Sequence, residues 1–254
     1  MIQLQVNGDA LLQLRKHRLY LDYTMALTDG LVAYYKLDES SGNATDSVWG
    51  FTMTNTNTCT FSAGKINNGA NTHPTGNKYF EVANDLWLNG SSQNWTVSMW
   101  IYPSGTISTQ QVFLNWSDNW YRIFNYIERF SSACRLVRVR WGIAADVCSK
   151  SQTFSDATWY HICWRYNWTT LNLKINDWTA TTFGSSGNGS WTWYTDTATI
   201  GAYNGWGTNF KGMADEVWFW NRNITDDEVT ALYNGGSGIQ YPFTTPNSNF
   251  LFFM

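Results

Sequence analysis

The chain has 254 residues, a length that suits a two-sheet β sandwich and exceeds that of many single domains. Aromatic residues make up 17% of it and charged residues only 14%, where about a quarter is usual. The sequence therefore has ample apolar bulk for a core and leaves amphipathic rings for a surface. The formal net charge of −3 gives no electrostatic reason to expect nucleic-acid binding, and no segment is suited to insertion into a membrane.

Residues 1–29 differ in pattern from the rest of the chain. Apolar and polar residues alternate over residues 2–6 and again over residues 19–27, which predicts two strands. The polar residues of the first run interrupt any apolar signal core, so no secretory signal peptide is expected. Two interpretations remain open: an extra edge strand on the chain's own sandwich, or an N-terminal arm that docks on a neighbouring subunit.

The segment 30–50 reads GLVAYYKLDESSGNATDSVWG and predicts a strand over residues 31–37 followed by a turn-rich loop. It closely resembles the first strand of laminin-G-like jelly-roll domains, whose pattern is GLVAYWxLDExxGxxxxDSxG. The matching residues are Gly30, Leu31, Val32, Ala33, Tyr34, Leu37, Asp38, Glu39, Gly42, Asp46, Ser47 and Gly50.

The middle of the chain predicts further strands. Residues 95–103 alternate cleanly and carry large side chains on both faces, which predicts a central strand covered on both sides. Strands are also predicted at residues 135–143, 159–164 and 171–175, the last ending at a turn formed by Asn176 and Asp177. The 159–164 segment resembles the WHHVAVTYD strand of the same family.

The closing segment 198–236 predicts a strand, a tight loop, a second strand and one short helix. Thr225 and Glu228 have the spacing of a capping box, and Gly235 is placed to end the helix in the left-handed conformation. The segment resembles the GxxDEVxxxxRxxTxxE ending of laminin-G-like domains. The matching residues are Gly212, Asp215, Glu216, Val217, Arg222, Thr225 and Glu228.

The resemblance covers about residues 30–236 and implies an all-β, concanavalin A-like fold. This fold is a jelly-roll sandwich of two antiparallel sheets, here with one short C-terminal helix and extended terminal arms. The predicted organisation is an N-terminal arm at 1–29, one laminin-G-like domain at 30–236 and a C-terminal tail at 237–254. The tail has few charges and ends in four apolar residues.

Related sandwiches include glycoside hydrolases, which place two carboxyl groups on one strand face, about 5 Å apart in the retaining enzymes. Asp215 and Glu216 are adjacent, so strand alternation predicts that they point to opposite faces. Glu81 and Asp85 are separated by the expected end of a strand. We therefore predict that the chain is not an enzyme and keep a glycoside hydrolase as a remote alternative.

One structural calcium ion is the cofactor that the resemblance implies, since many such sandwiches hold one where the first and last strands meet. Asp38, Asp46 and Asp215 are the candidate ligands, because calcium prefers carboxylate and carbonyl oxygens. In the alternative interpretation Asp38 and Asp46 cap turns through their own backbone, and Asp215 accepts hydrogen bonds from loop amides.

The four cysteines, Cys59, Cys134, Cys148 and Cys163, show no CxxC spacing and no zinc pattern. Cys134 and Cys148 flank a hairpin-like segment and are placed to pair. Buried free thiols are the alternative.

Aromatic side chains in loops are candidates for sugar binding, because their rings stack on the apolar faces of sugars. Such rings suit a protein interface equally well. The candidates for carbohydrate or partner binding are Trp116, Trp120, Trp191, Trp193, Tyr203 and Trp206.

Together these features predict a non-enzymatic structural or surface-display protein of a larger assembly. A decoration, fibre or tail protein of a phage or virus particle is the specific expectation, with a lectin-like face that contacts host glycans. Copies of itself and other subunits would bind through residues 1–29 and 238–254, at a virion surface or in an extracellular assembly. The alternative is a stand-alone carbohydrate-binding module or adhesin that depends on calcium.

Overall fold

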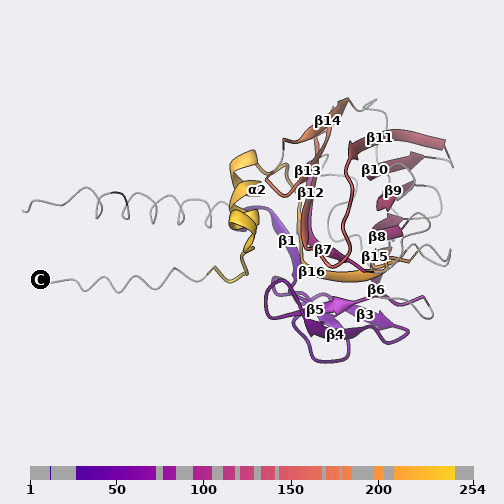
Figure 1. The fold of residues 1–254 in the computed structure, drawn as a ribbon, viewed down its shortest axis with the longest axis vertical. Helices are drawn as coiled ribbons and strands as arrows, with labels where there is room; N and C mark the ends of the chain where they lie inside the picture. The colour runs from indigo at the N-terminus through magenta and orange to yellow at the C-terminus, as the bar shows by residue number, and fades with distance from the viewer. Residues whose placement is uncertain are drawn as a thin grey trace, which may run out of the picture.

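The structure is a computed structural model of two stacked antiparallel β-sheets (Figure 1). It describes residues 12, 27–72, 77–83, 94–104, 111–117, 121–128, 133–140, 143–167, 170–177, 179–184, 197–202 and 209–243. Most of the predicted N-terminal arm, and the tail beyond residue 243, lie outside these residues. Within the described part of the chain, no helix has the length and apolar character needed to span a membrane.

Sheet 1 contains the first and last described strands. Its order is β14-β13-β12-β7-β16-β5-β4, and β1 is a further strand that pairs with β16. The bounds in that order are β14 (Thr181–Gly184), β13 (Thr170–Ile175), β12 (Tyr160–Asn167), β7 (Asn94–Pro103), β16 (Gly212–Trp220), β5 (Asn68–Asn71), β4 (Thr60–Ala63) and β1 (Leu31–Tyr35).

Sheet 2 has the order β11-β10-β9-β8-β15-β6-β3-β2. The bounds are β11 (Ile143–Ser151), β10 (Ala133–Arg140), β9 (Tyr121–Glu128), β8 (Gln111–Ser117), β15 (Thr197–Ile200), β6 (Tyr79–Ala83), β3 (Thr52–Thr56) and β2 (Ala44–Thr45). Strands that are distant in the sequence are neighbours in both sheets, which confirms the predicted jelly-roll sandwich.

The main core lies between the two sheets and is rich in aromatic rings. Phe113 of sheet 2 stacks on Trp164 of sheet 1 at a ring-centroid distance of 5.3 Å, and both are fully buried. Strand β7 runs between β12 and β16, with every second side chain in this core. Its alternate residues Thr96, Ser98 and Trp100 are buried on the outer face, so the prediction of a central strand covered on both sides is confirmed.

A second apolar cluster, here called the outer cluster, covers the face of sheet 1 that points away from sheet 2. It includes Tyr34, Trp218 and Trp220 of the sheet, together with Leu232 and Ile239 of the C-terminal region. The ring of Trp218 stacks on Tyr34 at 3.6 Å and on Trp220 at 5.6 Å. Figure 1 shows α2 (Asp226–Tyr233), which leads into η1 (Asn234–Gly236), on this side of the sandwich.

Helix α2 begins as predicted and ends one residue early. The Thr225 hydroxyl accepts the Glu228 amide and the Glu228 carboxylate accepts the Thr225 amide, which confirms the capping box. The left-handed conformation starts at Asn234, with φ 48°, and continues at Gly235. Arg165 of β12 fixes the helix to the sheet by donating to the Ile224 carbonyl oxygen at 2.9 Å and by pairing with Asp226.

The two ends of the described chain pack against the outer cluster. Leu27 is buried and its carbonyl oxygen accepts the Trp220 indole N–H at 2.8 Å. Leu27 and Thr28 are helical, so the predicted strand is wrong at its end, because this packing outweighs the local alternation. At the other end Phe243, from the predicted tail, stacks on Trp218 at 6.0 Å.

Cys148 is a free, buried thiol in β11, and its Sγ lies 3.4 Å from the Thr181 carbonyl oxygen. A disulfide to Cys134 is therefore not formed. The register of β10 and β11 explains this, since Cys134 lies opposite Lys150 and Cys148 lies opposite Leu136. Burial raises the pKa of the Cys148 thiol to about 11, which keeps it protonated.

Candidate functional site

A β-bulge at Glu216 interrupts the alternation of β16. Asp215 lies opposite Trp100 and Trp218 lies opposite Ser98, so two residues of β16 face one residue of β7. Glu216 takes up the extra length with φ 51°, a conformation that usually requires glycine. The prediction that Asp215 and Glu216 point to opposite faces is therefore wrong, because both carboxyl groups reach the outer side of sheet 1.

Glu216 is 0% exposed and belongs to a buried hydrogen-bond network. Its carboxyl group accepts the Tyr34 hydroxyl at one oxygen and Gln240 Nε2, at 2.6 Å, at the other. Gln240 Nε2 also lies 3.0 Å from Asp38 Oδ2, and Gln240 Oε1 accepts Asn67 Nδ2 at 3.2 Å. The network thus attaches the segment after η1 to the first strand, the last strand and the loop before β5.

Burial controls the protonation of this network. It raises the pKa of Glu216 to about 8, and the hydrogen bonds from Tyr34 and Gln240 only partly offset it. The pKa of Asp215 is raised by its own burial and by the nearby Glu216, against the backbone amides that it accepts. The Tyr34 pKa is also raised by burial, so its hydroxyl remains a donor. The network therefore carries less negative charge at neutral pH than its carboxyl groups imply.

The oxygens of the three predicted calcium ligands are occupied by hydrogen-bond donors. Asp46 accepts four backbone amides, two on each oxygen, at 2.7 to 3.1 Å, which fills about all its lone-pair positions. Asp215 accepts three backbone amides at 2.7 to 3.1 Å, and Asp38 accepts one backbone amide and two carboxamides at 3.0 to 3.2 Å.

These residues do not fit a shared calcium site. In the described part of the chain, no three His, Cys, Asp or Glu side chains are grouped to hold a metal ion. Asp46 and Asp215 make the amide contacts that the alternative interpretation predicted. Asp38 differs from it, because its backbone-amide partner is Asn68 of β5 and not its own turn.

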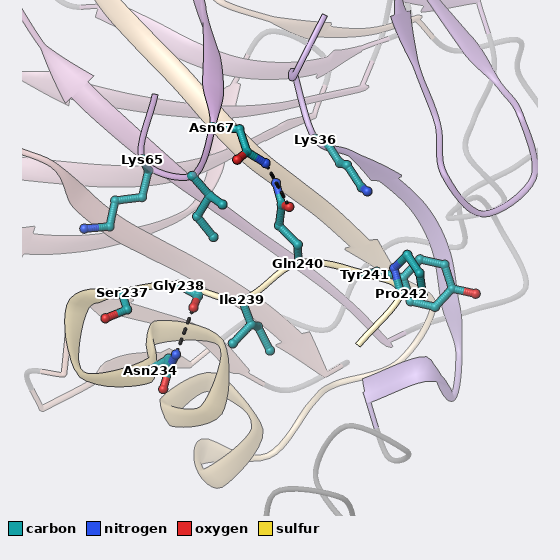
Figure 2. Close-up of a pocket in the computed structure, with 11 residues that line it drawn as sticks. Lys36, Lys65, Asn67, Asn234, Ser237, Gly238, Ile239, Gln240, Tyr241 and Pro242 are labelled. Carbon is teal, nitrogen blue, oxygen red and sulfur yellow. Dashed lines mark hydrogen bonds between the residues drawn. The ribbon is translucent and has the colours of Figure 1, made fainter. Parts of the chain in front are cut away.

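A pocket of about 680 Å³, here called the tail pocket, opens over this network. Figure 2 shows Lys36 and Lys65 on opposite sides of the hydrogen-bonded pair Asn67 and Gln240. The lining residues are Lys36, Lys65, Ile66, Asn67, Asn234, Ser237, Gly238, Ile239, Gln240, Tyr241 and Pro242. The lining thus combines two cationic side chains with carboxamides, a hydroxyl and an aromatic ring, and contains no acidic residue.

The floor of the tail pocket is fixed by close packing on Trp100. The ammonium group of Lys65 lies 4.5 Å from the centroid of the Trp100 ring, a cation–π contact. Gly238 has φ +75°, and a Cβ there would lie 3.1 Å from Ile66 Cδ1 and 3.2 Å from Trp100 Nε1. Glycine is needed for the backbone to lie this close to the sheet. Asn234 Nδ2 donates to the Gly238 carbonyl oxygen at 2.9 Å and completes the turn (Figure 2).

The predicted aromatic sugar-binding residues fall mostly outside the described residues. Trp116 lies in β8, opposite Ala198 of β15, and the other five candidates are not described. Sequence reasoning missed Trp49, which is 69% exposed on the loop that Asp46 binds. It also missed the tail pocket, since residues of its lining are about 200 positions apart and only the fold joins them.

The fold and the sequence agree on the family. The model of the concanavalin A-like lectin/glucanases superfamily matches residues 74–230, more than half of the chain. The chain belongs to this superfamily. No match was found among curated protein sequences.

Solved structures with this lectin-like sandwich are distant in sequence. Domain 4 of AbnA, a GH43 extracellular arabinanase from Geobacillus stearothermophilus solved with arabinotriose, has a TM-score of 0.64 at 20% identity, covering 79% of this chain and 96% of that one. The receptor-binding domain of botulinum neurotoxin D has a TM-score of 0.65 at 11% identity, covering 82% and 53%. A heptameric SAP-like pentraxin from Limulus polyphemus has a TM-score of 0.51 at 15% identity, covering 63% and 78%. At these identities the likeness is one of fold.

Proposed function

We propose that the chain is a non-catalytic carbohydrate-binding module that is displayed on a larger assembly. The tail pocket carries the carbohydrate part of this proposal, because its volume of about 680 Å³ is in the range of ligand sites. Asn234 and Ser237 expose hydrogen-bonding groups at its edge, and Tyr241 adds an aromatic ring. The similarity to an arabinanase domain solved with arabinotriose supports the same function.

The burial of Asp215 and Glu216 supports a non-catalytic role. Glycoside hydrolysis requires two carboxyl groups that reach the glycosidic bond. Both of these side chains are 0% exposed, and their oxygens are bound by Tyr34, Gln240 and backbone amides. A glycoside hydrolase is the remote alternative, and release of reducing sugar from a bound oligosaccharide would favour it.

A glycan array probed with the full-length chain tests the carbohydrate part. Ser237→Trp places a large ring at the exposed edge of the tail pocket and is expected to abolish binding. Thr153→Trp adds the same ring at an exposed position outside the pocket and is expected to leave binding unchanged. Silence of the unsubstituted chain on the array, or equal binding by both variants, would contradict the assignment of this pocket.

The way both ends of the described chain meet sheet 1 favours display on an assembly. Leu27 and Phe243 both pack on the outer cluster, so these two residues lie at the same face of the sandwich. Anchoring through both ends would leave the rest of the domain free for ligand. We propose that the predicted arms, residues 1–29 and 238–254, bind other copies or other subunits through the residues before Leu27 and after Phe243, which leaves residues 238–242 of the tail pocket available to ligand. A phage or virus surface, or another extracellular assembly, is the setting that we propose.

Light scattering on the full-length chain and on residues 27–243 tests the assembly part. The shorter chain keeps the contacts of Leu27 and Phe243 with the outer cluster, so its domain is expected to remain folded. The proposal expects oligomers from the full-length chain alone. If both the full-length chain and the shorter chain are monomers, the assembly part of the proposal is overturned. The stand-alone carbohydrate-binding module or adhesin is then the better description.

A further inference from the structure

The charge of the tail pocket is opposite to the charge of the chain. The whole sequence has a net charge of −3, yet the pocket is lined by Lys36 and Lys65 and by no acidic side chain. Neither lysine forms an ion pair with a residue that the structure describes. Both are only partly buried, so their charged groups remain accessible to a ligand at the pocket.

The carboxyl groups behind the lining neutralise this charge only in part. Asp38 already accepts three hydrogen bonds, from Asn67, Asn68 and Gln240. Glu216 is fully buried, and its two oxygens are bound by the Tyr34 hydroxyl and by Gln240 Nε2. Asp215 interacts with Lys65, but its oxygens already accept three backbone amides. The positive charge of Lys36 and Lys65 is therefore only partly offset by the carboxyl groups behind the lining.

The ammonium groups of the two lysines lie on opposite sides of the pocket, so they cannot both contact one small anion. Figure 2 shows their ammonium groups on opposite sides of the Asn67–Gln240 pair and pointing away from each other. A ligand that uses both lysines must extend across this pair and carry separate acidic groups. The exposed groups of Asn234 and Ser237 are then available to sugar hydroxyls.

We propose that the tail pocket binds an acidic oligosaccharide, whose carboxylate or sulfate groups contact Lys36 and Lys65. This inference rests on the carbohydrate-binding function proposed above. Lysine suits either group, because its ammonium is a point charge with three rotatable donors. The interaction is charge-assisted, and a hydrogen bond to a charged group contributes about 1.5 to 3 kcal/mol, or roughly tenfold to a hundredfold in affinity.

Calorimetric titration of the full-length chain tests the proposal with three acidic probes. Oligogalacturonate and sialyllactose carry carboxylates, and a heparin-derived oligosaccharide carries sulfates. Their neutral counterparts are the methyl-esterified oligogalacturonate, lactose and a desulfated, N-acetylated and carboxyl-reduced heparin oligosaccharide. We expect at least one acidic probe to bind at least tenfold more tightly than its counterpart, and the chemistry of that probe then identifies the acidic group.

Variants connect this binding to the two lysines. Lys36→Gln and Lys65→Gln are each expected to lower the affinity for the acidic probe by about tenfold or more. Lys36→Arg is expected to retain this affinity because it keeps the charge. Lys78→Gln removes a lysine outside the pocket and is expected to change nothing. Circular dichroism of each variant establishes that it is folded.

The outcomes separate this inference from the proposed function. Binding of a neutral probe that Ser237→Trp abolishes, with no gain from acidic groups, overturns the inference and keeps the carbohydrate-binding function. Acidic binding that both glutamine variants retain in full overturns the inference as well. Failure of all six probes overturns the inference, and silence on the glycan array would then also remove the proposed function.

Discussion

The buried Glu216 makes a prediction about pH that runs against common experience. A carboxyl group whose pKa is raised in the folded state binds more protons when folded than when unfolded. It therefore contributes stability in full below its unfolded pKa, and this contribution is lost as the pH rises through the folded pKa. For Glu216 these values are 4.5 and about 8, so the free energy of unfolding is expected to fall between them.

The size of this fall follows from the two pKa values. A difference of one pKa unit between the folded and unfolded states corresponds to about 1.4 kcal/mol of stability. Between pH 5 and pH 8 the folded state keeps most of its proton while the unfolded state has lost it, which gives a fall of about 3 to 4 kcal/mol for Glu216. Asp215 adds a fall of the same sign, because its pKa is raised too.

Urea denaturation followed by tryptophan fluorescence at several pH values between 5 and 8 measures this effect. Glu216→Gln keeps the size of the side chain and removes its titration, so its free energy of unfolding is expected to depend much less on pH. Asp156→Asn removes a carboxyl group at an exposed turn and serves as the matched control, with the slope of the unsubstituted chain.

Two results would refute the reasoning. The first is a free energy of unfolding that rises between pH 5 and pH 8 in the unsubstituted chain. The second is an unchanged slope in Glu216→Gln. Either one would mean that the hydrogen bonds from Tyr34 and Gln240 outweigh burial and keep Glu216 ionised when the chain is folded.

Three further predictions concern the contacts that fix the loops. Asp46→Ala leaves four backbone amides without their acceptor and is expected to cost about 2 to 4 kcal/mol of unfolding free energy, measured by urea denaturation; a cost below about 0.5 kcal/mol would show that water replaces the carboxylate. Arg222→Ala removes the two-point ion pair with Glu228 and the bond to the Asp29 carbonyl oxygen, and we expect a loss of about 1 to 2 kcal/mol. Because Asp46 and Asp215 are filled by amides, calcium and a chelator are expected to give the same Tm; a higher Tm with calcium would reinstate the calcium site.

The sequence predicted features that depend on local patterns. The alternation of β7 is set by side chains two residues apart, and the capping box by Thr225 and Glu228, three residues apart. Both patterns act through contacts within one element or its immediate neighbours, so they can be read before the fold is known. The two ends of the laminin-G-like pattern then placed β1 and β16 in one domain.

The site could not be predicted in the same way, because it depends on a bulge and on long-range contacts. Nothing in the alternation around Glu216 signals a left-handed non-glycine residue, and the bulge reverses the side that its carboxyl group takes. Gln240 reaches Asp38 across 202 residues of sequence. Trp49 lies within the segment 30–50 that resembles the laminin-G-like pattern, but its exposure depends on the loop conformation that Asp46 stabilises.

The pairing of β1 with β16 also affects how the chain acquires its structure during synthesis. Strand β16 lies between β7 and the pair β5 and β4, and it is also the partner of β1, so sheet 1 is divided until residue 220 has been made. Contacts between residues so far apart close slowly, because the intervening chain must first lose its freedom. A ribosome carrying this chain would thus present β7 with an open edge and the aromatic side chains of β1 uncovered until the last strand emerges. Chaperone dependence, and aggregation of chains that terminate before β16, follow from this order of strands.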